Sequence, residues 1–314
     1  MTIQRIRIPK EPHGSAAWLA QRWALPNGDK LISASVAAAI YDQHPFTSPA
    51  QLAAELLADA PPQPSEQNEA MERGNRLEPV IMEWANDKLG KNYTTPDELF
   101  LYIDNDTARL IATLDGYDGE SVLEIKTTTR EWTGVLPDYW AVQGIHQAIC
   151  ADVDYINWAI FDRSQTLNLY RQDVSSDEKR THIEAVRFWL CSIDLGMTPD
   201  GVAWTYDTIS RRHPNVDTEL VEVGPAVAEL VTQLKHVKSE AKAYAEMEDR
   251  LKAELCEMIG SAGAAVYNGE IVATWKPQTR KSLDQKALRE AHPDLVESYT
   301  KENTIRVLRL KGSN

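Results

Sequence analysis

The chain has 314 residues, 43% of them hydrophobic and 25% charged, and its formal net charge at pH 7 is −14. This length and composition are those of a globular protein with ample sequence for a core, in one large domain or two ordinary ones. No apolar run approaches the ~20 residues that a membrane-spanning helix needs, and the N-terminus lacks a signal-peptide core, so we expect a cytoplasmic protein without a membrane segment. The acidic balance argues against polyanion binding by the whole surface, although a local basic groove would suffice for nucleic acid.

Three cysteines, Cys150, Cys191 and Cys256, are far apart and odd in number. This spacing argues against a disulfide framework and against a four-cysteine cluster. We therefore expect buried, reduced thiols.

The first part of the chain is expected to hold one alternating apolar segment and four helices, at residues 3–8, 15–23, 31–40, 49–58 and 66–89. The first of these helices has Ser15 or Gly14 as its cap. In the last one, Pro79 should break or kink the helix near Glu78, which lies among apolar neighbours. A helical glutamate is usually solvated, so the importance of Glu78 depends on what it faces.

The stretch 110–126 carries the most distinctive chemistry. It contains two short apolar runs joined by a turn with Gly and Asp residues, which predicts a β-hairpin. Asp115 ends the first run, and the second holds Glu124 and Lys126. Because residues two apart on a strand point to the same face, Glu124 and Lys126 should project together while Ile125 points into a core. Two carboxylates beside one ammonium indicate a site for a hard divalent cation and a water molecule, which suits phosphodiester hydrolysis.

A helix over residues 137–150 should follow, with Pro137 near its first position. Gln143 and Gln147 share one face of it at i and i+4, so they form either a wall of a site or a wet surface. His146 points elsewhere and is expected to be structural.

The later elements are expected to be two strands, a helix, a boundary region, a long helix, a hairpin, a short helix and a last strand, at 155–161, 167–171, 177–195, 196–225, 226–260, 265–276, 283–290 and 304–311. The first of these helices should include Phe188 in its apolar face. The long helix has a heptad seam, typical of a coiled coil or of docking onto its own domain. Asn268 and Gly269 form the hairpin turn. From Lys276 onward nine Lys or Arg residues stand against five Asp or Glu residues, which indicates either a solvated face or a phosphate contact.

Arg22, Ser33 and Ser35 allow two interpretations. The serines can be ordinary helix caps, or they can bind a phosphate together with Arg22 at a helix N-terminus. The residues alone favour capping, because capping serines are common.

Four features occur in an order that is typical of one family: Glu78 within Arg73-Gly-Asn-Arg-Leu-Glu-Pro-Val, Asp115-Gly, Glu124-Ile-Lys126, and Gln143. In this order they resemble the lambda exonuclease and YqaJ-type viral recombinases of the PD-(D/E)XK nuclease superfamily, over roughly residues 15–195. Trp18, Arg22 and the segment 32–35 also look like the part of lambda-type exonucleases that binds a terminal 5′ phosphate. The resemblance thus shifts our interpretation of Arg22, Ser33 and Ser35 from capping to DNA binding.

The resemblance implies a metal-dependent DNA exonuclease, a phosphodiester hydrolase that degrades linear duplex DNA from 5′-phosphorylated ends in phage-type homologous recombination. Asp115, Glu124 and the carbonyl of Ile125 would hold Mg²⁺ or Mn²⁺, and Glu78 would help to hold a second ion or its waters.

The same resemblance assigns the catalytic side chains besides the metal ligands. Lys126 would orient or deprotonate the attacking water and stabilise the transition state. Gln143 would hold Lys126 or that water in place.

The implied fold is α/β (α+β), with a central mixed β-sheet flanked by helices in a restriction-endonuclease-like core. It would comprise a nuclease domain at 1–200, a linker at 201–225 and a long-helix and β-hairpin extension at 226–314. The implied partners are DNA duplex ends, a single-strand annealing protein and further copies of the chain, for example in a trimer. The location would be the cytoplasm of a host cell if the chain is viral.

Three other interpretations stay open at this point. A structure- or sequence-specific endonuclease would use the same active site. A non-catalytic DNA-binding recombination protein could be built on a retired nuclease fold. The motifs could also occur by chance in an unrelated acidic α/β protein, since Glu-x-Lys alone is a weak signal.

Overall fold

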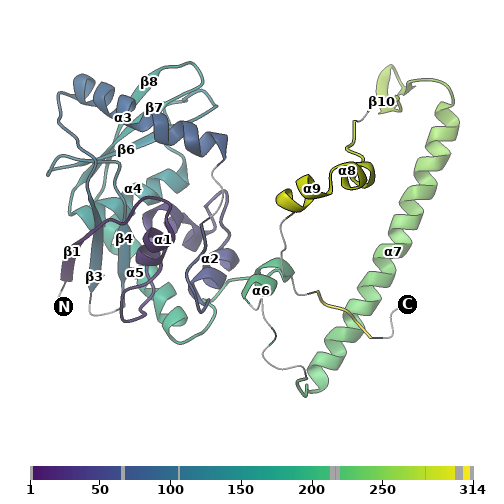
Figure 1. Ribbon diagram of the computed structural model, residues 1–314, viewed down its shortest axis with the longest axis horizontal. Coiled ribbons are helices and arrows are strands. Elements are labelled where there is room, and N and C mark those ends of the chain that lie inside the picture. The colour runs from purple at the N-terminus through teal and green to yellow at the C-terminus, as the bar shows by residue number, and fades with distance from the viewer. Residues whose placement is uncertain are drawn as a thin grey trace. The chain divides into compact units, whose positions relative to one another are not determined.

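The computed structural model describes residues 3–64, 68–104, 107–212, 216, 220–279, 281–300 and 307–311. The chain divides into two compact units, Met1–Arg212 and His213–Asn314. The first unit is a mixed α/β structure that contains every residue of the predicted site (Figure 1). The predicted fold class is confirmed, although the strands form two four-stranded sheets rather than one central sheet.

The first sheet has the order β1-β3-β4-β2, with β1 at Ile3–Pro9, β3 at Glu98–Asp104, β4 at Arg109–Ala112 and β2 at Ile32–Ser33. β3 pairs antiparallel with both β1 and β4, whereas β2 runs parallel to β4. All four residues of β4 are buried, which is the pattern of a strand covered on both faces.

The second sheet has the order β5-β6-β7-β8, with β5 at Gly116–Tyr117, β6 at Val122–Thr127, β7 at Tyr155–Phe161 and β8 at Leu167–Asp173. β6 and β7 are parallel, and α4 (Asp138–Ala151) makes the crossover between them that a parallel pair requires. The two predicted strands that became β7 and β8 are confirmed as an antiparallel pair.

Of the hairpin predicted over 110–126, only the second strand is confirmed. Its second run is β6, but its first run is β4, which belongs to the other sheet and does not pair with β6. The hairpin partner of β6 is the two-residue strand β5. Asp115 therefore lies at the step between the two sheets, where the chain leaves β4 and enters β5.

The helices of the first unit besides α4 are α1 (Ala16–Trp23), the 3-10 helix η1 (Ala34–Tyr41), α2 (Pro49–Leu56), α3 (Glu69–Leu89), α5 (Ser176–Asp194) and α6 (Tyr206–Arg212). The predicted cap of α1 is confirmed, because Ser15 Oγ accepts a hydrogen bond from the Trp18 N–H. The helix predicted at 31–40 is instead strand β2 followed by η1. α6 lies within the segment expected to be a linker, and it contacts α2.

α3 passes through Pro79 without ending, so the predicted break is wrong. Proline removes the N–H that would bond to the carbonyl of Asn75. Both Asn75 and Pro79 are exposed, so water can satisfy that carbonyl. The helix begins after the N-cap Asn68, and residues 66 and 67 of the predicted span lie outside the described residues.

The main core lies where α4 and α5 pack on the strands. α4 contacts strands of both sheets, and α3 packs on β6, β7 and β8 (Figure 1). Phe188, expected in the apolar face of α5, is 53% exposed, because the buried face of this helix runs through His182, Val186 and Trp189. The three cysteines are free as predicted, but only Cys150 is buried.

His146 is buried in α4, and its Nδ1 lies 3.0 Å from Nε2 of His182 in α5. Burial lowers the pKa of His146 well below its usual value, so the ring is neutral. Its structural role, linking α4 to α5, agrees with the prediction.

Gly144 permits the close approach of α4 to β8. A Cβ at this position would collide with the side chain of Gln172 and lie 3.1 Å from Trp158 Cζ2. Gln172 cannot move away without cost, because its Oε1 accepts from Trp158 Nε1 at 3.0 Å and its Nε2 donates to the Ala141 carbonyl at 2.9 Å. We expect Gly144→Ala to lower the free energy of unfolding by about 1–3 kcal/mol.

Gly74→Ala is the matched control, because Gly74 lies in helix α3 and a Cβ there would meet Thr127 Oγ1 at an ordinary 3.7 Å. This control should be neutral or stabilising by about 0.5–1 kcal/mol, since alanine restricts the unfolded chain. Urea denaturation followed by tryptophan emission measures both variants, and it reports mainly on the first unit because Trp275 is the only tryptophan after residue 212. Equal stability of the two variants would contradict the close packing of α4.

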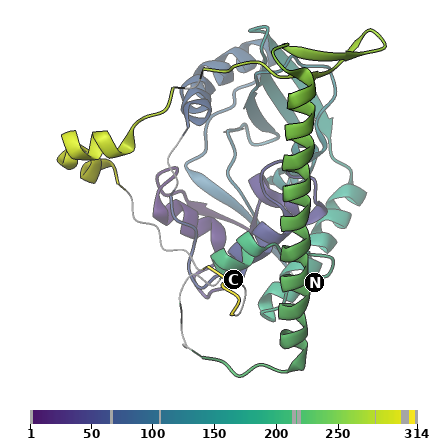
Figure 2. The same cartoon turned by 90° about the vertical axis from the view of Figure 1, so that its right-hand side faces the viewer.

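The second unit contains α7 (Pro225–Ile259), β9 (Ala264–Tyr267), β10 (Glu270–Thr274), α8 (Gln285–Ala291) and α9 (Pro293–Tyr299). α7 is one uninterrupted helix of 35 residues (Figure 2), and none of its residues is buried. The predicted Asn268-Gly269 hairpin turn is confirmed, with φ of 51° and 85° at the two residues. Of the predicted last strand, residues 304–306 lie outside the described residues and 307–311 form no strand.

Within the described ranges, no helix has both the length and the apolar character needed to cross a membrane.

Candidate active site

Glu124 lies at the centre of a set of polar side chains from β6 and α4. Its Oε1 accepts hydrogen bonds from Lys126 Nζ at 2.7 Å and from Gln143 Nε2 at 2.6 Å. Its Oε2 accepts one from Gln147 Nε2 at 2.5 Å. Gln143 Oε1 in turn accepts from Lys126 Nζ at 3.1 Å. Because Glu124 is only 3% exposed, these donors replace water as the groups that stabilise its charge.

Local structure explains why these side chains converge. Glu124 and Lys126 are two apart on β6 and project to the same face, while Ile125 packs against the apolar residues between α3 and the sheet, as predicted. Gln143 and Gln147 are one turn apart on α4, the crossover helix that covers β6. The two glutamines therefore form a wall of this site, and the wet-surface alternative is excluded.

Asp115 adds a second carboxylate from the step between the two sheets. Its Oδ2 accepts a hydrogen bond from the Ile125 N–H at 2.8 Å, which fixes it beside β6. Burial and the charges of Glu124 and Glu78 raise the pKa of Asp115 well above its usual range. Burial and the charge of Glu124 likewise raise the pKa of Glu78, so α3 delivers a third carboxylate to the same site.

Lys126 is the cation within this acidic group. Burial alone would lower its pKa, but the charges of Glu124 and Asp115 and the hydrogen bond to Glu124 raise it above the usual lysine value. The charge of the Lys126 ammonium acts on the carboxylates of Glu124, Asp115 and Glu78. The site therefore has more negative than positive charge in a partly buried position.

The donor chemistry of this cluster fits a divalent cation such as Mg²⁺. Carboxylate oxygens are the ligands that hard cations prefer, and a cation would relieve the repulsion that raises the pKa values of Asp115 and Glu78. Within the part of the chain that the structure describes, no three His, Cys, Asp or Glu side chains are grouped so as to hold a metal ion. An ion bound here would therefore complete its shell with main-chain carbonyls and water.

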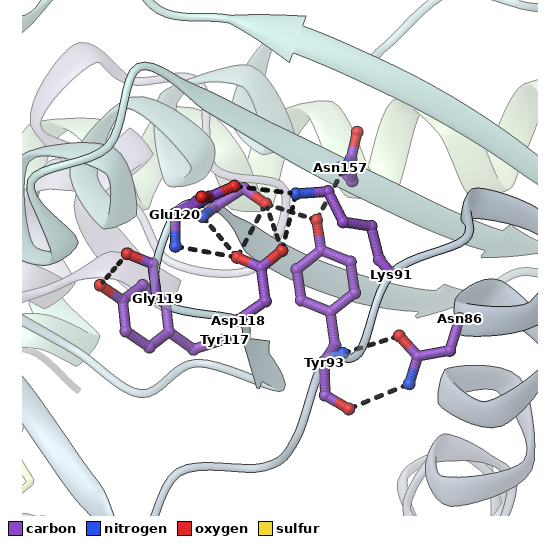
Figure 3. A network of polar contacts seen from close by, with 9 residues as sticks. Asn86, Lys91, Tyr93, Tyr117, Asp118, Gly119, Glu120 and Asn157 are labelled. Carbon is purple, nitrogen blue, oxygen red and sulfur yellow. Dashed lines mark hydrogen bonds and ion pairs between the residues drawn. The ribbon is translucent and has the colours of Figure 1, made fainter.

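A separate polar network holds the β5–β6 turn that follows Asp115 (Figure 3). Asp118 accepts hydrogen bonds from the main-chain N–H groups of Glu120 and Ser121 and forms an ion pair with Lys91 at 2.9 Å. The hydroxyls of Tyr93 and Ser121 lie 2.5 Å apart in the interior. These contacts fix the turn of the hairpin, which lies between Asp115 and Glu124 in the chain.

Arg22 forms a second site with the two serines. Its guanidinium donates to Ser33 Oγ at 3.1 Å and to Ser35 Oγ at 2.5 Å, and it lies 4.1 Å from the centroid of the Trp18 ring. Burial lowers the pKa of Arg22 to about 10. Arg22 Nε is buried without a hydrogen-bond partner, and no carboxylate among the described residues forms a salt bridge with Arg22. A buried cation without a counter-ion is costly, so this site suits an anion.

Space for such an anion exists beside Arg22. A cavity of about 130 Å³ is lined by Arg22, Ser33, Ser35, the acidic Glu55 of α2 and mostly apolar residues from the surrounding elements. Ser33 precedes η1 but makes no capping hydrogen bond with its side chain, so the capping interpretation fails for Ser33. The hydroxyls of Ser33 and Ser35 lie 3.3 Å apart and face the same guanidinium.

The structure thus brings the predicted residues together in two groups. Glu124, Lys126 and Gln143 are joined by hydrogen bonds, Asp115 is bonded to the N–H of Ile125 between Glu124 and Lys126, and the charge of Glu124 acts on Glu78. Arg22, Ser33 and Ser35 form the second group. Sequence reasoning missed His44, whose ring stands 6.2 Å from that of Tyr139, because a single histidine in a loop carries no local signal.

Residues 17–154 match the YqaJ-like viral recombinase domain family model. No curated protein matches the chain.

Among solved structures, an alkaline exonuclease from Laribacter hongkongensis, LHK-Exo, is 22% identical over 58% of this chain and 95% of its own, with a TM-score of 0.44. Its structure in complex with dAMP gives 21% identity, 58% and 93% coverage, and a TM-score of 0.45. A phage-related exonuclease from Haemophilus somnus 129PT is 13% identical, with 52% and 94% coverage and a TM-score of 0.36.

The matched residues include Arg22, Ser33 and Ser35. They also include the other predicted site residues, which are Glu78, Asp115, Glu124, Lys126 and Gln143. Over residues 17–154 the chain is therefore similar to YqaJ-like viral recombinase domains.

Proposed function

We propose that this protein is a metal-dependent DNA exonuclease that degrades linear duplex DNA from 5′-phosphorylated ends. The observation that carries the proposal is Glu124, held by Lys126, Gln143 and Gln147 beside Asp115 in a partly buried site. A YqaJ-like domain and similarity to structures named as exonucleases support a nuclease role.

Asp115, Glu124 and the main-chain carbonyl of Ile125 would hold Mg²⁺ or Mn²⁺, and Glu78 would hold its waters or a second ion. A bound divalent cation supplies a water of lowered pKa and neutralises charge on the phosphate. Hydrolysis would leave a 5′ phosphate on the released nucleotide.

Lys126 and Gln143 would act on the attacking water and on the phosphate. The ammonium of Lys126 lies within reach of a water near Glu124, where it can orient that water, exchange a proton with it or donate to a phosphate oxygen. Gln143 bonds to both Lys126 and Glu124, so it keeps Lys126 in one position.

Arg22, Ser33 and Ser35 would bind the terminal 5′ phosphate. A phosphate would be the negatively charged partner of the Arg22 guanidinium. It would also accept hydrogen bonds from the hydroxyls of Ser33 and Ser35. This contact would select phosphorylated ends and set the position of the cleaved bond.

Assembly and partners belong to the same proposal. The protein would form a homo-oligomer, for example the trimer that the resemblance implies, and the exposed apolar seam of α7, which includes Leu230, Val237 and Leu251, could support another assembly. A protein that anneals the exposed single strand would complete phage-type recombination, in the cytoplasm of the host if the chain is viral.

A digestion assay with end-labelled linear duplex and closed circular DNA, each with Mg²⁺ or with EDTA, tests the proposed function. We expect the linear duplex alone to be degraded, only with Mg²⁺, with mononucleotides as the first products. Cleavage of the closed circle would make the protein an endonuclease. Absence of cleavage under all metal conditions by folded protein would favour a non-catalytic DNA-binding role.

A further inference from the structure

Phe46 is an aromatic side chain that the fold holds out into solvent. It is 83% exposed and lies in the loop between η1 and α2. Single exposed apolar residues are common on protein surfaces and usually need no explanation. Phe46 differs from them in its support, its neighbours and the cavity beside it.

Hydrogen bonds hold the loop around Phe46 in one conformation. His44 Nδ1 accepts hydrogen bonds from the N–H groups of Phe46 at 3.3 Å and of Thr47 at 2.8 Å. Ser48 and Gln51 then form a reciprocal capping box at the start of α2. The backbone of Phe46 is thus fixed on both sides, so the loop loses little backbone freedom on binding.

A chain of ring contacts connects Phe46 with helix α4, which carries Gln143 of the proposed active site. The ring of His44 lies 6.0 Å from that of Phe46 and 6.2 Å from that of Tyr139, edge-on in both cases. Tyr139 is one turn before Gln143 on α4, and Gln143 contacts Lys126. Burial lowers the pKa of His44, and the charge of Lys126 lowers it further.

The cavity beside Phe46 adjoins the Arg22 site. It has a volume of about 280 Å³ and is lined by Phe46, Thr47 and residues of α2. Glu55 and Pro62 line both this cavity and the 130 Å³ cavity at Arg22. The cavity beside Phe46 therefore shares part of its lining with the cavity at Arg22, and ring contacts through His44 and Tyr139 connect Phe46 with the helix that carries Gln143.

We propose that Phe46 stacks on a nucleobase near the 5′ end of the bound strand, which rests on the proposed action of this protein on DNA. Every base has a π-face, so an exposed aromatic ring can hold any sequence without base-specific hydrogen bonds. The phosphate at Arg22 fixes the end of the strand, and Phe46 fixes the orientation of a base.

The experiment measures cleavage kinetics of a 5′-phosphorylated duplex by the full-length protein and three variants. Phe46→Ala should raise KM roughly 5- to 100-fold with little change in kcat, as expected for one lost base-stacking contact. Phe46→Trp should keep the wild-type KM, because indole offers a larger stacking face. Phe188→Ala is the matched control, since Phe188 is also exposed but lies on α5, and it should behave as wild type.

A second set of duplexes carries one abasic nucleotide at each of the first four positions from the 5′ end. At the position whose base stacks on Phe46, the abasic substrate should already show the raised KM, and Phe46→Ala should add nothing to it. The position of this non-additive pair identifies the contacted base.

Failure of the stacking proposal and failure of the nuclease proposal are distinguishable. A wild-type KM for Phe46→Ala on the intact duplex overturns stacking while the nuclease function stands. A raised KM that stays equally large on all four abasic duplexes also overturns it, because the contact is then not to a base. If the wild-type protein cleaves no DNA, the nuclease function is overturned and the stacking proposal falls with it.

Discussion

Lys126→Ala should reduce the rate of DNA cleavage by roughly 10²- to 10⁴-fold while DNA binding is largely kept. The ammonium of Lys126 bonds to both Glu124 and Gln143 and is the cation of the acidic group, so its removal takes away the group that orients water and stabilises charge on the phosphate. Single-turnover digestion of a linear duplex with saturating Mg²⁺ measures the rate, and fluorescence anisotropy of labelled DNA measures binding. Cleavage at the wild-type rate would contradict the assignment of Lys126.

Two further variants separate chemistry from folding. Lys126→Ala leaves the carboxylate of Glu124 buried without its ion-pair partner, which can destabilise the fold. The double variant Lys126→Ala with Glu124→Gln removes both charges, so it should unfold at a temperature close to that of the wild type and remain inactive. Lys179→Ala is the matched control, because Lys179 forms an ion pair of the same 2.7 Å length with Asp154 at the surface. This control should cleave as the wild type does.

Arg22→Ala should reduce the preference for 5′-phosphorylated over 5′-hydroxyl ends by roughly 10- to 100-fold, the value of one or two charged hydrogen bonds to a phosphate. Arg22→Lys should recover only part of this preference, since an ammonium cannot contact a phosphate with two parallel N–H groups. Competition between labelled duplexes that differ only in the terminal group measures the preference.

A structural role for Arg22 would give a different result. In that case Arg22→Ala would lower the free energy of unfolding and slow cleavage of both kinds of end equally. Because Arg22 is a buried cation without a carboxylate partner, we expect its removal to leave the free energy of unfolding nearly unchanged. Arg171→Ala serves as the control for a general loss of positive charge, because Arg171 pairs with Asp173 on the exposed side of β8.

Predictions from the sequence succeeded where neighbouring residues decide the structure. Ser15 caps α1, and the Asn268-Gly269 turn has the two positive φ angles that the residue pair favours. The projection of Glu124 with Lys126 follows from strand geometry alone. The spacing of Gln143 and Gln147 placed both on one face of α4 for the same kind of reason.

Predictions failed where contacts between distant parts of the chain determine the structure. β4 is as apolar as a hairpin strand would be, but pairing with β3 and β2 covers it more completely than pairing with β6 would. Pro79 remains inside α3 because water can reach the carbonyl that it leaves unbonded, and solvent exposure is a property of the packed helix.

The sequence by itself determined the order and type of the proposed catalytic residues, and the periodicity of β6 and α4 determined that Glu124 shares a face with Lys126 and Gln143 with Gln147. Only the tertiary structure decided their chemical state. The connection between β4 and β5 places Asp115 beside β6, where burial and like charges raise its pKa, and the packing of α1 beside β2 leaves Arg22 a buried cation that donates to two hydroxyls. Burial and the distances between charges depend on contacts across the whole unit, so neither the raised pKa of Asp115 nor the lowered pKa of Arg22 follows from the sequence.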